Sequence, residues 1–132
     1  MTRETRCVSV RINRPAADAY EFLCQPENFP KWASGLGAAL RRDGAEWIVE
    51  TPEGRASVRF SERNSYGVLD HQVNLPGAAP IYVPLRLVAN GDACDLVLTI
   101  FRRPGVSDAQ FTADAEWVMR DLQAAKRLLE AS

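Results

Sequence analysis

The segment "VSVRINRPAADAYEFLCQPENFPKW", residues 8–32, contains the features that decide the fold. Val8, Val10 and Ile12 alternate with polar residues, and this period of two predicts a half-buried strand. Pro15 follows, and it suits the first position of a helix because its missing N–H would have no partner there. The chain is therefore expected to begin with a strand that leads directly into a helix.

The rest of this segment predicts short helical pieces. The helix is expected to run to about Cys24, because Pro26 cannot continue it. After Pro26 the prolines leave room only for one or two short turns, with Phe29 and Trp32 as apolar anchors. Two short helices are therefore expected after the first strand.

Turn signals alternate with short apolar segments from residue 37 to residue 102. Asn90–Gly91 and similar pairs accept the positive φ that tight hairpins demand. Six strands are expected between the turns: "GAALRR" (37–42), "EWIVE" (46–50), "ASVRFSE" (56–62), "GVLDHQV" (67–73), "PIYVPLRLVA" (80–89) and "DLVLTIFR" (95–102). Short connections imply an antiparallel meander, and Pro84 predicts an edge or a bulge because it cannot donate to a ladder.

A long amphipathic helix is expected at the end of the chain. Ser107 and Gln110 have the spacing of a capping box, which marks its start. Apolar residues then recur every three or four positions for about six turns, which predicts one buried face. They are Phe111, Ala115, Val118, Leu122, Ala125 and Leu129.

These elements predict one α+β domain over residues 1–132. Its seven-stranded, curved antiparallel sheet needs a cover for its apolar face, and the terminal helix has the stripe to supply it. The two short helices lie between the first and second strands.

Composition limits the classes of function. With 46% hydrophobic and 25% charged residues and a net charge of −1, the chain is expected to be soluble, without the basic footprint of a nucleic-acid-binding protein. It has no apolar run for membrane insertion and no signal peptide, so a cytoplasmic location is expected. Three scattered cysteines and one histidine make a poor metal site, and neither a metal nor another cofactor is expected.

The order of elements resembles the helix-grip fold of the START-like, or SRPBCC, superfamily, which includes the birch-pollen-allergen group and the polyketide cyclases. Residues 8–32 carry the first part of this resemblance. Four further segments are similar to one uncharacterised bacterial subgroup: "GVLDHQVNLPG" (67–77), "VPLRLVANGD" (83–92), "LTIFRRPGVSDAQF" (98–111) and "AEWVMRDLQAAKRLLE" (115–130). The resemblance implies a cavity between the sheet and the terminal helix that holds a ligand, but it implies no single reaction.

Strand parity predicts which side chains face this cavity. His71, the only histidine, shares the apolar face of its strand with Leu69, whereas Asp70 points the other way. Asp70 and His71 therefore cannot form a catalytic dyad within one regular strand. The residues expected to contact a ligand are His71, Trp32, Trp47, Phe60, Leu69, Leu85, Val118, Met119 and Leu122.

His71 admits three interpretations. It is a structural histidine bonded to a backbone carbonyl or a water, a polar contact that orients a mostly apolar ligand, or a catalytic acid or base. It is the only catalytic candidate, and catalysis needs a second inward polar group. Thr99, Tyr82 and Arg86 qualify only if a bulge near Pro84 shifts the register.

Three functions follow from these features. The first is a module that binds a small hydrophobic molecule, with His71 as its polar contact. The second is an enzyme of the cyclase, dehydratase or hydrolase kind that uses the same cavity. The third is a protein-interaction module of the co-chaperone kind, which would have a small cavity and an exposed apolar patch.

Overall fold

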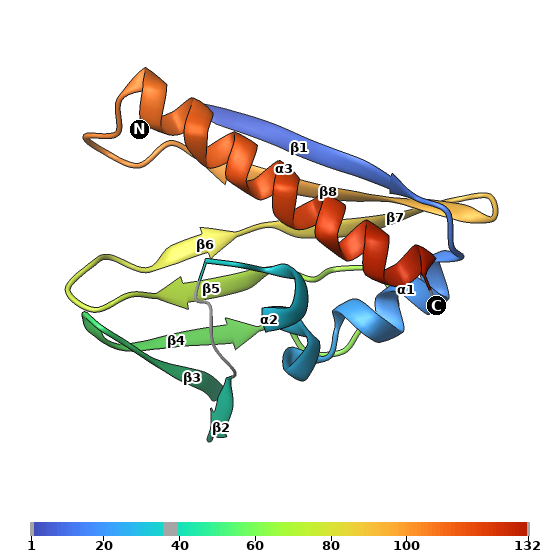
Figure 1. Cartoon of the computed structure of the whole chain (residues 1–132), viewed down its shortest axis with the longest axis horizontal. Helices are drawn as coiled ribbons and strands as arrows, with labels where there is room; N and C mark the ends of the chain where they lie inside the picture. Colours follow the sequence, from blue (N-terminus) through green and yellow to red (C-terminus); the bar gives the residue numbers. More distant parts are fainter. Residues whose placement is uncertain (1, 36–39, 132) are drawn as a thin grey trace.

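A computed structural model describes residues 2–35 and 40–131 of the chain (Figure 1). The strands in this part are β1 (Thr5–Ile12), β2 (Arg41–Asp43), β3 (Glu46–Thr51), β4 (Gly54–Phe60), β5 (His71–Asn74), β6 (Ile81–Val83), β7 (Leu85–Asn90) and β8 (Ala93–Phe101). The helices are α1 (Ala16–Leu23), the 3₁₀ turn η1 (Pro26–Asn28), α2 (Phe29–Trp32) and α3 (Asp108–Glu130). The α+β class, the early short helices and the long terminal helix agree with the sequence.

The strands form two antiparallel sheets, so the prediction of one seven-stranded sheet is wrong in its count. One sheet has the order β2-β3-β4-β5-β6 and the other the order β1-β8-β7 among the described residues. The extra strand arises at Pro84, which divides the predicted strand 80–89 into β6 and β7. Proline has no N–H to donate, so the regular ladder stops there.

The register nevertheless continues across Pro84. His71 is opposite Val83 in the first sheet, and a bridge places Val68, three residues before His71, opposite Arg86, three residues after Val83. On the other side the Thr99 N–H donates to the Pro84 carbonyl at 3.1 Å. The two sheets therefore meet at Pro84 as one curved surface.

The predicted strand 37–42 is only partly within the described residues, because positions 36–39 lie outside them. Its described end is β2, a three-residue strand that is exposed throughout.

Helix α3 lies along β1 and also contacts α2 (Figure 1). Ser107 caps its start, since its side chain accepts from the Gln110 N–H at 3.1 Å. Only half of the predicted capping box forms, because the Gln110 side chain donates to Asp114 instead of returning to the cap. Phe111, Leu122, Ala125 and Leu129 are the buried residues of this helix and form its apolar stripe.

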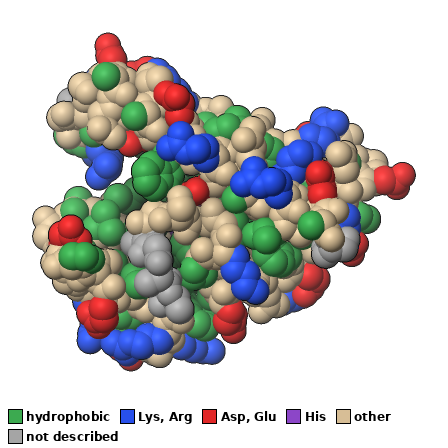
Figure 2. Space-filling model, in the orientation of Figure 1, with side chains coloured by type: hydrophobic (Ala, Val, Ile, Leu, Met, Phe, Trp, Pro, Cys, Tyr) green, Lys and Arg blue, Asp and Glu red, His purple; other side chains and the backbone are tan. Residues whose placement is uncertain are grey.

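The core joins α3, α1 and the inner face of the sheets. Ile12, Leu96 and Leu122 are each 0% exposed and lie in this cluster. Figure 2 shows acidic, basic and apolar side chains interspersed on the surface, with a hollow between the N-terminal half of α3 and the β5–β6 region. No helix in the described part of the chain has the length and apolar character needed to span a bilayer.

Candidate functional site

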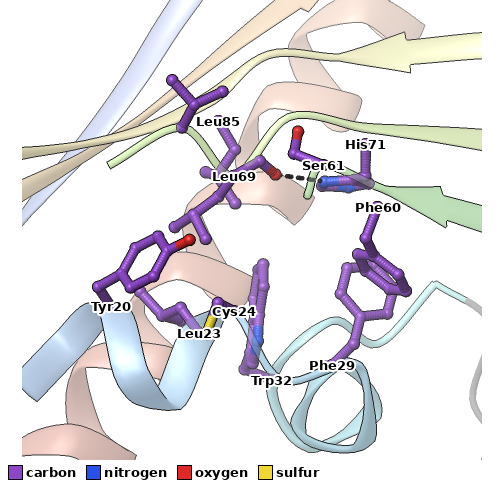
Figure 3. Close-up of a pocket in the computed structure, with 11 residues that line it drawn as sticks. Tyr20, Leu23, Cys24, Phe29, Trp32, Phe60, Ser61, Leu69, His71 and Leu85 are labelled. Carbon is purple, nitrogen blue, oxygen red and sulfur yellow. Dashed lines mark hydrogen bonds between the residues drawn. The ribbon is translucent and has the colours of Figure 1, made fainter. Parts of the chain in front are cut away.

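A small pocket lies between α1, α2 and the chain segment 61–70, which leads into β5 (Figure 3). Its wall is mostly apolar and carries no charged side chain. It consists of Tyr20, Leu23, Cys24, Phe29, Trp32, Phe60, Ser61, Val68, Leu69, His71 and Leu85. The cavity volume is about 10 Å³, which is close to the space that one water molecule occupies.

The ring of Phe29 is the common neighbour of three other rings of the pocket wall. Its centroid is 5.3 Å from that of Trp32, 5.2 Å from that of Phe60 and 5.2 Å from that of His71, each in an edge-to-face arrangement. Such contacts add to the stabilisation that burial provides. The pocket is therefore small because an aromatic side chain of α2 occupies the room between the other rings.

His71 is 6% exposed, and its Nδ1 lies 3.2 Å from the carbonyl oxygen of Leu69. Burial lowers the pKa of His71 below its ordinary value, so the ring is neutral near pH 7. In a neutral ring whose Nδ1–H donates to Leu69, Nε2 is a hydrogen-bond acceptor. The backbone contact agrees with the structural interpretation of His71, and it leaves this second nitrogen for another partner.

Trp32 is the second polar feature of the wall. The residue is 5% exposed, and its buried Nε1 has no hydrogen-bond partner among the described residues. A buried N–H group without a partner is uncommon in folded proteins and costs stability. This donor therefore marks a place where a polar atom of a ligand would be stabilised.

Asp70 takes no part in the pocket. Its carboxylate accepts from the Leu85 N–H at 2.9 Å, from Arg86 Nε and Nη2 at 2.8 and 2.7 Å, and from the Tyr82 hydroxyl. The Arg86 guanidinium holds the pKa of Asp70 well below its usual range. The carboxylate is therefore ionised, fully bonded and on the opposite face from His71, as strand parity predicts.

Tyr82 and Arg86 stay with Asp70 on that outer face, because the register does not shift at Pro84. Thr99 is also outside the pocket and contacts the Cys7 thiol. None of the three residues considered as a second inward polar group therefore faces His71. Strand parity places Asp70, Tyr82 and Arg86 on one face of the sheet, so their cluster could have been predicted from the sequence.

Five of the nine residues expected to contact a ligand line the pocket. They are His71, Trp32, Phe60, Leu69 and Leu85. Leu122 belongs to the central core, whereas Trp47, Val118 and Met119 are half-buried and outside the pocket wall. The remaining lining residues come mainly from α1 and α2. The only local pattern that points to them is the spacing of Tyr20, Leu23 and Cys24, which places these residues on one face of a helix.

The cysteines are free, and Cys24 alone among them lines the pocket. Burial raises the pKa of its thiol, so Cys24 is protonated near pH 7. In residues 2–35 and 40–131, no three His, Cys, Asp or Glu side chains gather in a way that could hold a metal ion.

No family model and no curated protein matches the chain. Several solved structures are similar to it in fold. A protein from Mesorhizobium loti is 16% identical, with a TM-score of 0.73 over 98% of each chain. Ara h 8.0201 is 10% identical, with a TM-score of 0.70 over 98% of this chain and 99% of its own.

DynU16, a protein of the dynemicin biosynthetic locus, is 18% identical, with a TM-score of 0.70 over 96% of this chain. The match covers 47% of DynU16, so this chain spans about half of its length. At these identities the likeness shows the fold alone. The fold is the helix-grip fold, as the sequence resemblance implied.

Proposed function

We propose that the chain binds a small, mostly apolar molecule in the pocket between α1, α2 and the segment leading into β5. The observation that carries this proposal is the buried, unpartnered N–H of Trp32 in an otherwise apolar wall that also holds His71. Ligand sites typically combine apolar walls with a few polar groups of this kind. The likeness to DynU16, from a biosynthetic locus, supports a small organic molecule as the ligand.

Binding requires the pocket to open, since about 10 Å³ admits no organic molecule. The group suited to move is the Phe29 side chain on α2, a helix that is only four residues long and also carries Trp32. Beyond its end, Ser34 is held to α3 by hydrogen bonds from its N–H and hydroxyl to Asp121 at 3.2 and 2.7 Å. A rotation of the Phe29 side chain, with α2 in place, would give its volume to the ligand and leave Trp32 in the wall.

A catalytic role for His71 has less support. The wall has no carboxylate, and the Ser61 hydroxyl already donates to the Asp70 carbonyl at 2.6 Å. Acid–base catalysis normally uses a second group to orient the first or to meet developing charge. Binding needs only a donor, such as the Trp32 N–H, or an acceptor, such as His71 Nε2, in the wall.

The small closed volume also agrees with a protein-interaction module. That function needs a continuous exposed apolar patch as well. The exposed large apolar side chains of the described surface are distributed over α3, three strands and a loop: Tyr66, Tyr82, Val88, Phe101, Trp117 and Leu128. Ligand binding is therefore the better-supported function.

Toluene titration followed by NMR tests the proposal. The chain has three tryptophans, so the indole N–H signals of Trp47 and Trp117 are internal controls for Trp32. A saturable shift of the Trp32 signal alone is expected. Cys24→Phe, which fills the pocket, should abolish the shift, and Cys7→Phe, at an exposed position, should not. Equal shifts of all three signals, or no shift at all, would overturn the proposal.

A further inference from the structure

We infer that the free edge of β1 is a docking site for an extended acidic segment of another protein, which adds to the sheet as a further strand and places carboxylates beside Lys126 and Arg127. This inference is independent of the proposed function, because the edge and its groove share no residue with the pocket.

Strand β1 is the long unpaired edge of the described sheets. It has eight residues and pairs only with β8, whereas the edge strands β2 and β6 have three residues each. Part of β7, the remaining edge strand, is joined to residues 67–69 by bonds from the Leu69 and Leu87 N–H groups. In Figure 1, β1 has β8 on one side and no strand on the other. A long free edge of this kind is a template for strand addition.

Hydrogen-bond parity shows which backbone groups of β1 point away from β8. The Arg102 N–H donates to the Glu4 carbonyl at 2.8 Å, immediately beyond the paired residues. In an antiparallel ladder the bonds to one neighbour recur at every second residue, so the even-numbered residues of β1 bond to β8. The N–H groups of Cys7, Ser9 and Arg11 therefore point outward along the free edge.

Helix α3 covers only the C-terminal end of this edge. Lys126 Nζ donates to the Arg11 carbonyl at 2.7 Å. In contrast, Cys7 and Ser9 are exposed, and no described group bonds to their outward N–H or carbonyl groups. These backbone groups are therefore available to an incoming strand.

A groove of about 340 Å³ lies beside the edge, between β1 and α3, and its wall has three cations and no acid. The lining residues are Val10, Arg11, Gln123, Lys126 and Arg127. Arg11 pairs with Asp95, and Lys126 pairs with Glu130. Arg127 is exposed and has no ion pair in the part of the chain that the structure describes. A carboxylate on the added strand would therefore meet an unpaired cation.

The same charges disfavour a second copy of this chain as the added strand. Strand β1 carries Arg6 and Arg11, so pairing two such edges would bring these arginines and the cations of both grooves together. Like charges across paired strands are destabilising. An acidic segment avoids this repulsion, and strand addition takes its affinity from backbone hydrogen bonds, so it does not depend on a continuous apolar patch.

An NMR titration of the full chain with three synthetic peptides tests the inference. The probes are acetyl-ETEVETE-amide, its basic counterpart acetyl-KTKVKTK-amide, and the acidic peptide with every backbone amide N-methylated. We expect the acidic peptide to cause saturable downfield shifts of the Cys7, Ser9 and Arg11 N–H signals. Val8 and Val10 should shift much less, because their N–H groups already bond to β8. The N-methylated peptide keeps its charges but cannot donate to a strand, so it should bind much more weakly.

Ser9→Pro tests the backbone contribution. It removes one outward N–H and leaves the ladder to β8 intact, and proline is tolerated on an edge strand. The acidic peptide should bind this variant at least about fivefold more weakly. Ser9→Ala, which keeps the N–H, should bind like the unmodified chain. The Val8 and Val10 signals show whether β1 of each variant is still in the sheet.

Arg127→Gln tests the charge contribution, and it does not alter the backbone of β1. The acidic peptide should bind this variant about two- to fivefold more weakly. Arg59→Gln is the matched control, because Arg59 is an exposed arginine on β4 in the other sheet. The control should leave the affinity unchanged, and equal losses in the two variants would overturn the role of the groove.

The other outcomes also overturn a defined part of the inference. Equal binding of the N-methylated peptide, or shifts without the odd–even alternation, would overturn strand addition. Tightest binding of the basic peptide would overturn the acidic partner. Shifts of the same three signals with protein concentration alone would assign the edge to a second copy. No saturable shift with any peptide would overturn the docking site itself.

Discussion

Asp70 and His71 are neighbours in the sequence, and their side chains lie on opposite faces of the sheet. Each contacts one backbone group of the Leu69–Leu85 pair that the pair itself leaves without a partner. Leu69 donates its N–H to the Leu85 carbonyl at 2.8 Å. In the other direction the Leu85 N–H donates to Asp70 Oδ1 at 2.9 Å, and the Leu69 carbonyl lies 3.2 Å from His71 Nδ1. Two side chains therefore satisfy the backbone groups beside Pro84, where β6 and β7 divide.

Asp70→Asn should destabilise the protein by about 1–3 kcal/mol, measured by urea unfolding. The amide keeps the shape of the carboxylate but removes the charge that holds Arg86, and it leaves one of the buried donors without an acceptor. Asp95→Asn is the matched control, because Asp95 pairs with Arg11 at the surface. The control should lose much less stability, and equal losses would show that the Asp70 cluster does not secure the junction.

His71 should make stability depend on pH below the ordinary histidine pKa of about 6.5. Its pKa is lowered in the folded protein, so the unfolded chain binds the proton more readily. Stability is therefore present above the ordinary histidine pKa of about 6.5 and falls as the pH drops below it, by at most about 1.4 kcal/mol per pH unit.

His71→Asn removes this titration, so the difference in stability between the two proteins should change across this range. Burial raises the pKa of Asp121, which acts in the opposite direction, but it is present in both proteins and cancels in the comparison. Asp70, whose pKa is lowered, affects stability only below about pH 4. A difference that stays constant with pH would contradict the neutral, buried state of His71.

Phe29→Ala should cost about 3–5 kcal/mol, because it removes the ring that fills the space between Trp32, Phe60 and His71. The same change should create a cavity that binds toluene more tightly than the unmodified chain does. Phe101→Ala, at a residue 40% exposed, should lose much less stability and gain no binding. Unchanged toluene affinity in Phe29→Ala would show that this ring does not occupy the ligand's place.

Gly67→Ala should destabilise the protein more than Gly91→Ala. Both glycines have positive φ, +72° and +60°, which costs an alanine about 1–2 kcal/mol at either site. At Gly67 the added Cβ would also stand 2.2 Å from the Leu87 carbonyl oxygen, whereas Gly91 has nothing within 4 Å. Unfolding free energies check the order, and equal losses would contradict the close packing of the segment that carries Leu69.

The sequence predicted the features that depend on local period and on single residues. Alternation placed His71 inward and Asp70 outward, and the missing N–H of Pro84 predicted the position of the irregularity. The predicted number of strands was wrong because Pro84 divides one predicted strand into β6 and β7. These two strands pair with different neighbours, β5 and β8. The capping box formed only in part because Asp114 competes for the Gln110 side chain.

The pocket was less accessible to prediction because it depends on tertiary contact. Tyr20, Leu23 and Cys24 line it only because α1 packs beside the segment leading into β5, and no local pattern fixes that approach. Its volume depends on whether Phe29 points between the other rings, which follows from packing and not from periodicity. The sequence therefore placed His71 on the inner face but did not predict the size of the pocket beside it.

Native mass spectrometry of the freshly purified chain and of Cys24→Phe tests the central claim most directly. The unmodified chain should carry a small, mostly apolar molecule, which is released when the protein unfolds, and Cys24→Phe should carry none. A molecule retained equally by both proteins, or a clean chain mass for both, would contradict a ligand in the pocket beside His71 and Trp32.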